Sequence, residues 1–320
     1  MGTARHPLSI DPAVGQVLPN DLKAQLEAEL DALAGLEGAD GIAPGLVRLS
    51  RRVARAQAAT RAAIRGKAPT GTGPPGTAPH PARRLEPSTV AFDVALLRDL
   101  LRILSAESGP APPEDHLRTL TDAADREPEV LRHLATAILL DDDTRSIQVL
   151  AQRLNVPPTA LHFIGRLLAA PFVAEARYRG GWPSDVDARA VETAEAGRCP
   201  TCASPPVLAV LSRDEGCRHL VCGLCGDTWR APRLMCAACG TRDQSRLGLL
   251  YVHETDARWI ETCDACGCYL KTVDQRRLPE DCLILQRAED VASLYLDFMA
   301  EDAGYVRPDC YPSLLVEDPT

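Results

Sequence analysis

Four Cys-x-x-Cys pairs are the residues of this sequence best suited to chemistry. They lie within 68 residues and hold eight of the 12 cysteines. A tight turn brings both sulfurs of such a pair to one side, so that they can grip a metal ion, and two pairs complete a tetrahedral site. The sequence therefore predicts two metal ions, iron or zinc, each held by four of the thiolates of Cys199, Cys202, Cys222, Cys225, Cys236, Cys239, Cys263 and Cys266.

The spacing favours a grouping of consecutive pairs. The first four cysteines follow C-x2-C-x19-C-x2-C over residues 199–225, and the next four follow C-x2-C-x23-C-x2-C over residues 236–266. Both gaps are typical of a zinc ribbon or rubredoxin-type module. Spacing alone leaves a crossed grouping open. Glycine follows the second cysteine of three pairs, where the turn favours a positive φ, whereas Ala203 follows the first pair.

The predicted sites are structural rather than catalytic. A closed shell of four cysteines leaves no position for water or substrate on the metal. Repeated redox-active Cys-x-x-Cys motifs are the alternative, but no thioredoxin-like βαβ pattern surrounds any pair. The other four cysteines are Cys217, Cys268, Cys282 and Cys310. We expect them to be spare thiols, although the first two lie near enough in sequence to replace a ligand.

Composition and charge exclude several classes of protein. Hydrophobic residues make up 45% of the 320 residues and aromatic residues only 4%, which favours helix packing over a sheet sandwich. No run approaches the ~20 apolar residues of a membrane span, and no secretory signal is visible, so we expect a cytoplasmic protein. The net charge is -9, of which residues 274–320 carry -7. A nucleic-acid-binding surface should instead be basic.

The pattern along the chain predicts an α+β fold. A mainly helical N-terminal domain is followed by two tandem four-cysteine modules, rubredoxin-like or zinc-ribbon, and a C-terminal helix. The predicted domains are 1–190, with a flexible loop at 66–88, then 191–232, 233–275 and 276–320. Apolar periodicity predicts helices over 21–36, 45–65, 89–107, 113–127, 128–140, 144–154 and 157–179. Short β-prone runs adjoin the cysteine pairs at 206–211, 218–221, 247–252 and 259–262.

One predicted helix, 45–65, carries six arginines. A solvated basic face explains them most simply. A docking surface for an acidic partner is the alternative.

Three stretches around the cysteine pairs resemble one family. They read CPTCASPPVLAVL, GCRHLVCGLCGDTWRAPRLMCAACG and ETCDACGCYLKTVDQ, and the later stretch EDVASLYLDFMAEDAGYVRPDCYPSLL is similar too. Together they resemble the formate dehydrogenase accessory proteins of the FdhE family over about 120 residues. Ala203, Cys268 and Cys310 depart from the family pattern.

The resemblance implies an assembly factor rather than an enzyme. Such a factor is cytoplasmic, binds the catalytic subunit of a molybdenum- or tungsten-dependent formate dehydrogenase and is needed for its maturation. The ribbons of the family are rubredoxin-like and associated with iron. The most recognisable stretch makes Arg218, His219, Trp229 and Arg233 candidates for client contact. The rival account is internal: Trp229 covers a metal site, and Arg218 binds a carbonyl or offsets thiolate charge.

Two other functions fit a pair of ribbons. One is electron transfer by rubredoxin-type iron, which needs a partly exposed metal. The other is nucleic-acid binding, against which the acidic C-terminal region and the lack of interleaved basic and aromatic residues argue. Neither membrane insertion nor a nucleic-acid partner is expected, and a homo-oligomer is left open.

Overall fold

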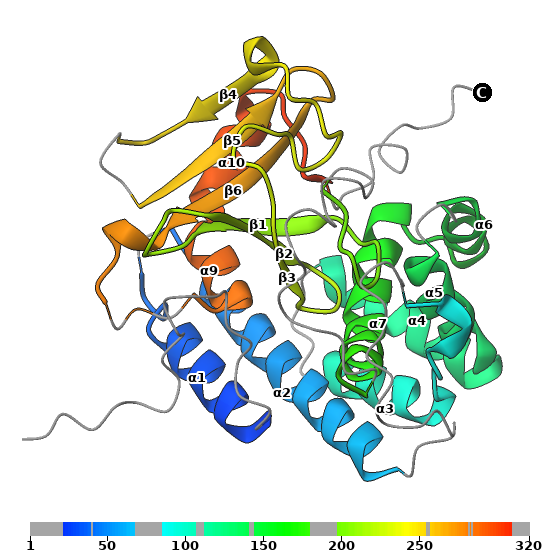
Figure 1. Ribbon diagram of the computed structural model, residues 1–320. Coiled ribbons are helices and arrows are strands. Elements are labelled where there is room, and N and C mark those ends of the chain that lie inside the picture. Colours follow the sequence, from blue (N-terminus) through cyan, green and yellow to red (C-terminus); the bar gives the residue numbers. More distant parts are fainter. Residues whose placement is uncertain are drawn as a thin grey trace, which may run out of the picture. The chain divides into compact units, whose positions relative to one another are not determined.

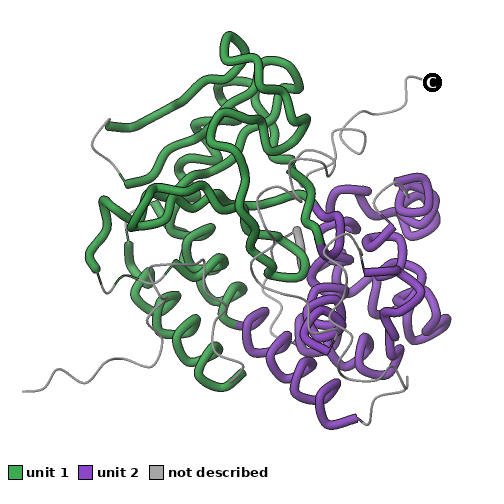
Figure 2. Tube along the Cα trace, in the orientation of Figure 1, with its two compact units in different colours: residues 1–51, 183–200, 205–309 green, residues 52–182, 201–204, 310–320 purple. Residues whose placement is uncertain are grey.

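A computed structural model describes residues 22–39, 41–67, 85–106, 112–140, 144–179, 197–253, 257–280, 282 and 284–308. The chain forms two compact units (Figures 1 and 2). The first comprises residues 1–51, 183–200 and 205–309, and the second comprises residues 52–182, 201–204 and 310–320. The predicted class, a helical N-terminal part followed by four-cysteine modules and C-terminal helix, is confirmed. The predicted domain boundaries stay a prediction, and most of the predicted loop 66–88 lies outside the described residues.

The second unit is helical. It contains α3 (Val94–Ser105), α4 (Pro112–Arg126), α5 (Glu129–Leu139), α6 (Thr144–Leu154), α7 (Pro158–Arg179) and the part of α2 (Pro44–Gly66) that follows residue 51. A 3-10 turn, Pro87–Thr89, precedes α3. The core is built mainly from leucine side chains on the inner faces of these helices, among them Leu97, Leu100, Leu101, Leu104, Leu120, Leu131, Leu134, Leu161 and Leu168.

Local signals in the sequence set the ends of these helices. Asp93 caps α3, because its carboxylate accepts hydrogen bonds from the N–H groups of Ala95 (2.9 Å) and Leu96 (3.1 Å). Pro128 separates α4 from α5, and Asn155, with a φ of 52°, separates α6 from α7. Gly165 lets α7 lie against α5, since a Cβ there would stand 2.8 Å from Ile138 Cγ1.

Part of the basic face of α2 is internal to the second unit. Glu175 of α7 is completely buried, and the Nε atoms of Arg61 and Arg65 each donate to it at 2.7 Å. These two arginines are four residues apart and thus on the same side of α2. They therefore neutralise a buried carboxylate, which neither a solvated face nor a docking surface would require.

Residues 201–204 group with the helical unit through two hydrogen bonds. The Leu85 N–H donates to the Thr201 carbonyl at 2.7 Å, and Arg166 donates to the Ser204 hydroxyl at 3.4 Å.

No single helix in the described parts of the chain is long and apolar enough to cross a membrane, although α6 and α7, bent by 111°, pass that test as a pair.

The first unit is organised around one six-stranded sheet. Its strands are β1 (Pro206–Leu211), β2 (Arg218–Cys222), β3 (Thr228–Arg230), β4 (Leu247–Leu250), β5 (Arg258–Cys263) and β6 (Cys268–Asp274), in the order β3-β2-β1-β6-β5-β4. Each predicted ribbon supplies three antiparallel strands, and the parallel pairing of β1 with β6 joins the two sets. The tandem ribbons thus share a single sheet (Figure 1).

Helices of the described chain also belong to the first unit. α10 (Leu294–Asp302) covers one face of the sheet, where Leu296 and Ala300 pack against Ile260 and Tyr269. The unit also contains α1 (Leu22–Ala34), the first part of α2 and α9 (Gln286–Ala292), which share an apolar cluster. Two 3-10 turns, Gln244–Arg246 and Gln275–Arg277, flank β4 and β6. The expected single C-terminal helix is divided at Ser293.

A buried charge network fastens the sheet to α9 and α10. Lys271 on β6 is 2% exposed, and its Nζ donates to Asp297 Oδ2 (2.7 Å) and to the Asp290 carbonyl (2.9 Å) and contacts Asp290 Oδ1 (2.5 Å). Arg307 pairs with both aspartates, and the Tyr269 hydroxyl donates to Asp297. Burial acts to raise the pKa of Asp290, but Arg307 and Lys271 lower that pKa overall.

We predict that Lys271→Met lowers the free energy of unfolding by about 3–5 kcal/mol, because two carboxylates lose their buried cation. The lowered pKa of Asp290 means that its contribution to stability is complete above about pH 4 and is lost as the pH falls further. In the variant the pKa of Asp290 in the folded state should lie closer to its unfolded value, so less stability should be lost below about pH 4. Urea unfolding between pH 3 and 7 measures both effects. Lys23→Met, which removes an exposed ion pair with Glu27, is the control and should change stability by less than about 0.5 kcal/mol. Equal stability of the two variants would contradict the role given to Lys271.

Candidate metal centres

The eight paired cysteines gather into two clusters of four. The sulfurs of Cys199, Cys202, Cys222 and Cys225 all lie within 4.8 Å of one another, and so do those of Cys236, Cys239, Cys263 and Cys266. This is the grouping of consecutive pairs that the spacing favours. None of these cysteines forms a disulfide.

The distances between sulfurs fit a tetrahedral ion. Sγ–Sγ distances are 3.6 Å for Cys199 and Cys225, 3.7 Å for Cys236 and Cys266, and 3.8 Å for Cys239 and Cys263. Four sulfurs placed about 2.3 Å from a central ion lie about 3.8 Å apart, whereas a disulfide needs about 2.05 Å. Both clusters can therefore hold an ion such as Zn²⁺ or iron.

Strand ends position the cysteines. Cys222 ends β2 and Cys263 ends β5, so each lies where a strand turns into the next knuckle. Within the knuckles the backbone turns toward sulfur: Leu224 N and Cys225 N donate to Cys222 Sγ at 3.3 and 3.4 Å, and Ala238 N donates to Cys236 Sγ at 3.3 Å. Such N–H groups stabilise thiolate ligands.

Each Cys-x-x-Cys turn, here called a knuckle, is followed by a residue with a left-handed backbone conformation. The φ angles are 70° at Gly226, 74° at Gly240, 69° at Gly267 and 62° at Ala203. Ala203 therefore adopts the conformation of the glycines in spite of its Cβ, which costs about 1–2 kcal/mol. The first knuckle departs from the others in residue type but not in geometry.

The two clusters differ in burial. All four cysteines of the first are buried, whereas in the second Cys239 is exposed and Cys266 is half-buried. In the second cluster, burial and the neighbouring sulfurs raise the pKa of Cys236 to about 12 and also raise the pKa of Cys266. Four thiolates so close together need a cation to remain ionised at neutral pH.

A segment after α10 braces the second cluster. Val306 N donates to the Gly267 carbonyl (2.9 Å), Tyr269 N donates to the Val306 carbonyl (2.9 Å), and the Tyr305 hydroxyl donates to Asp264 (2.6 Å). The cysteine spacing gives no sign of this brace, because its residues lie about 40 positions further along the chain.

The four candidates for client contact lie in different environments. Arg218 is 1% exposed and donates to the carbonyls of Pro232 (3.0 Å) and Met235 (3.2 Å) and to Glu261 (2.5 Å). Trp229 is completely buried. The carbonyl contacts of Arg218 are those of the internal account given above. His219 is half-buried and Arg233 is exposed, and client contact through any of the four residues stays a prediction.

The spare cysteines are also dispersed. Cys268 is buried at the start of β6, two residues after Cys266, and burial raises the pKa of its thiol. Cys217 and Cys282 are half-buried and belong to neither cluster. Cys310 lies outside the described residues.

The cysteine-rich region matches two family models in succession. Residues 198–233 match the central domain of FdhE, and residues 234–314 match its C-terminal domain. The matched region contains both cysteine clusters in full.

Curated proteins and a solved structure give the same result. The FdhE homolog of Aquifex aeolicus is 33% identical over 112 residues, and FdhE of Escherichia coli O1:K1 is 37% identical over 122 residues. These alignments cover 34% and 36% of this chain and 38% and 37% of the relatives, so they span well under half of either protein. The crystal structure of FdhE from Pseudomonas aeruginosa shares the fold over 94% of this chain and 97% of that one, with a TM-score of 0.59 and 24% identity. Residues 198–314 are therefore similar to the central and C-terminal domains of FdhE.

Proposed function

We propose that this chain is a metal-binding accessory protein for the assembly of active formate dehydrogenase. In this role it binds the immature catalytic subunit, and each cysteine cluster holds one iron or zinc ion. The proposal rests on one observation: the region that matches FdhE is the region whose folding brings eight thiols into two tetrahedral clusters. The family resemblance described above supplies the client.

The ions in this proposal are structural. Four sulfurs fill the coordination sphere of each ion, so neither substrate nor water reaches it. Their effect is to tie strand ends together in ribbons too small to fold on a hydrophobic core alone. A structural Zn²⁺ contributes on the order of 10–16 kcal/mol in such modules. A rigid sheet can then present a binding surface to the client.

The second cluster also supports an alternative function. Because Cys239 is exposed and Cys266 half-buried, an iron ion there would be close enough to solvent to exchange electrons with a partner. Electron transfer requires reversible cycling between Fe(III) and Fe(II). Anaerobically prepared protein that holds only zinc would exclude it.

Deletion of the gene tests the proposed role in the cell. We predict loss of formate dehydrogenase activity with an unchanged level of the catalytic subunit's transcript, and restoration by the wild-type gene. The tagged protein should co-purify with that subunit. Full activity in the deletion strain, or a falling transcript, would contradict a role in maturation.

Removal of one pair of ligands tests the metal sites. We predict that replacing Cys222 and Cys225 with serine lowers the metal content from two ions per chain to one and unfolds the first ribbon, while the helical signal in circular dichroism is largely kept. The matched control replaces Cys217 and Cys282, which lie outside both clusters, and should keep two ions. Unchanged metal content in the first variant would show that the ligand assignment is wrong.

Ala203, which has a positive φ in the first knuckle, allows a test in which a substitution should stabilise the metal site. We predict that Ala203→Gly stabilises the first site by about 1 kcal/mol, because glycine adopts a positive φ without strain. Gly226→Ala should weaken the same site by a similar amount, since a Cβ there meets no atom within 4 Å and the cost is that of the backbone alone. Titration with a coloured chelator measures both. Equal metal retention by the two variants would contradict this account of the knuckles.

A further inference from the structure

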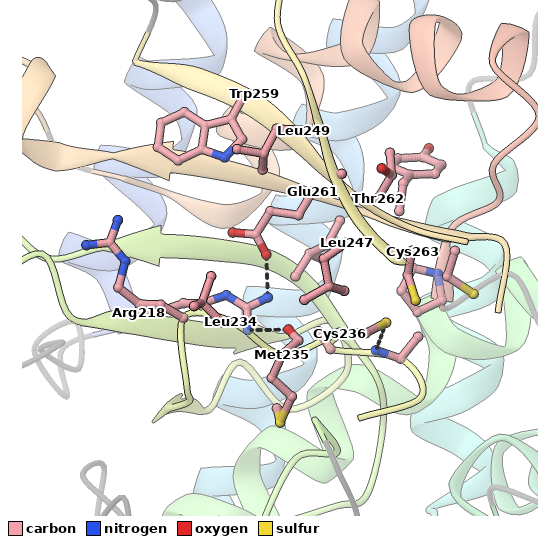
Figure 3. Close-up of a pocket in the computed structure, with 18 of the residues that line it drawn as sticks. Arg218, Leu234, Met235, Cys236, Leu247, Leu249, Trp259, Glu261, Thr262 and Cys263 are labelled. Atoms are coloured by element: carbon pink, nitrogen blue, oxygen red, sulfur yellow. Dashed lines mark hydrogen bonds and ion pairs between the residues drawn. The ribbon is translucent and has the colours of Figure 1, made fainter. Parts of the chain in front are cut away.

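An apolar groove lies on the sheet face opposite α10. Its volume is ≈ 330 Å³. β4 and β5 form one wall with Leu247, Leu249 and Trp259, and the segment before β4 forms the other with Leu234 and Met235 (Figure 3). Cys236 and Cys263 also line it, so the groove borders the second cysteine cluster.

The groove runs beside an open edge of the sheet. β4 pairs with β5 on one side, and no described strand pairs with its other side. The Asp264 N–H donates to the Arg246 carbonyl at 2.9 Å, which makes these two opposed residues a hydrogen-bonded pair. Hydrogen-bonded and non-hydrogen-bonded pairs alternate in an antiparallel ladder. The N–H and C=O groups of Leu249 and the C=O of Leu247 therefore point away from β5, toward the open edge, whereas the Leu247 N–H donates to the Gln244 carbonyl.

Exposed apolar side chains concentrate at this edge. In the described part of the first unit, six large apolar side chains are exposed, and four of them are Leu234 (58%), Leu249 (51%), Tyr251 (37%) and Val252 (50%). The opposite edge strand, β3, is only three residues long, ends at an exposed arginine and is followed by Pro232, which are features that protect an edge. Within β4 there is neither charge nor proline. Unprotected apolar edges of this kind mark binding sites for extended chains.

The charges in the groove favour a carboxylate. Glu261 is the only acidic side chain among the described lining residues, and Arg218 already pairs with it. The Nε of Arg218 is buried without a hydrogen-bond partner. Arg233 at the mouth is exposed, and no described residue forms an ion pair with it. Apart from the cysteines of the second cluster, Arg233 is thus the one charged side chain of the described lining without a partner of opposite charge.

We propose that the groove and the open edge of β4 bind an extended segment of a partner protein. The segment adds a strand to the sheet through the N–H and C=O of Leu249 and the C=O of Leu247, inserts alternate apolar side chains into the groove and places an Asp or Glu at Arg233. A second copy of this chain fits less well, because residues 246–252 contain no carboxylate to meet Arg233. The identification of the partner as the immature formate dehydrogenase subunit rests on the proposed function. The binding of an extended, acidic and apolar segment does not depend on it.

Peptide selection on the intact, metal-loaded protein tests the proposal. The probe is a phage-displayed library of random ten-residue peptides. Enriched peptides should carry apolar residues at alternate positions and at least one Asp or Glu. When such a peptide is bound, hydrogen exchange at the Leu249 amide should slow, whereas exchange at Leu247, whose N–H already donates to Gln244, should change little. Because formate dehydrogenase is absent from this assay, the groove proposal can fail while the proposed function holds. Equally, the proposed function can fail while the groove proposal holds.

Variants separate the edge from the groove. Leu249→Pro removes an outward N–H and should weaken peptide binding at least tenfold, as measured by fluorescence anisotropy, whereas Leu249→Ala keeps the donor and should weaken it less. Arg233→Glu should weaken binding at least fivefold. Two matched controls should bind normally: Arg230→Glu on β3 and Phe298→Arg on α10, both at exposed positions away from the groove. Metal content and circular dichroism establish that each variant is folded.

Four results would overturn the proposal. The first is that no peptide is enriched above the level found with an unrelated protein, and the second is that the enriched peptides bind Leu249→Pro and Arg233→Glu as tightly as the wild type. The third is that the protein self-associates and Leu249→Pro makes it monomeric, which would place a second copy at the edge. The fourth is that peptides bind only after the chain is truncated behind Pro308, which would make its own C-terminal segment the occupant.

Discussion

Mutual repulsion among buried thiolates is the constraint on which the cysteine-rich unit depends. Eight sulfurs stand in two groups with neighbours 3.6–3.8 Å apart, and in the second group burial raises the pKa of Cys236 and Cys266. Only a cation at the centre lets four thiolates share so small a volume. Because Cys222 and Cys263 are the last residues of β2 and β5, ions held there would also fix where these strands end and how the chain turns back. On the proposed function, metal binding and the formation of the sheet are therefore one event.

The sheet extends this local constraint across the unit. Parallel pairing of β1 with β6 makes the two ribbons share six strands, and all seven residues of β6 are buried. Lys271 on that strand holds α9 and α10 on one face through Asp290 and Asp297. The other face keeps a groove and an unpaired edge at β4. One side thus serves stability, and the other is the side to which we assign recognition.

Much of this architecture could be predicted from the sequence, for physical reasons. Periodicity and capping are local signals, so the helices at 144–154 and 158–179 match the predicted ranges closely. Cysteine spacing is equally local and predicts both clusters. The strand at 268–274 was not predicted, because Lys271 interrupts its apolar pattern and only a distant aspartate pair makes its burial tolerable. The joining of the ribbons, the brace from Tyr305 and the open edge of β4 depend on contacts between distant residues, which no local pattern encodes.

Native mass spectrometry of freshly prepared intact protein tests the central claim most directly. The account predicts a single folded species whose mass exceeds that of the chain by two metal ions, with each ion replacing the protons of the thiols that bind it. Treatment with acid should release both ions and expand the charge-state distribution as the sheet unfolds. A folded species at the mass of the metal-free chain, or one lighter by the hydrogens lost to disulfides, would contradict it.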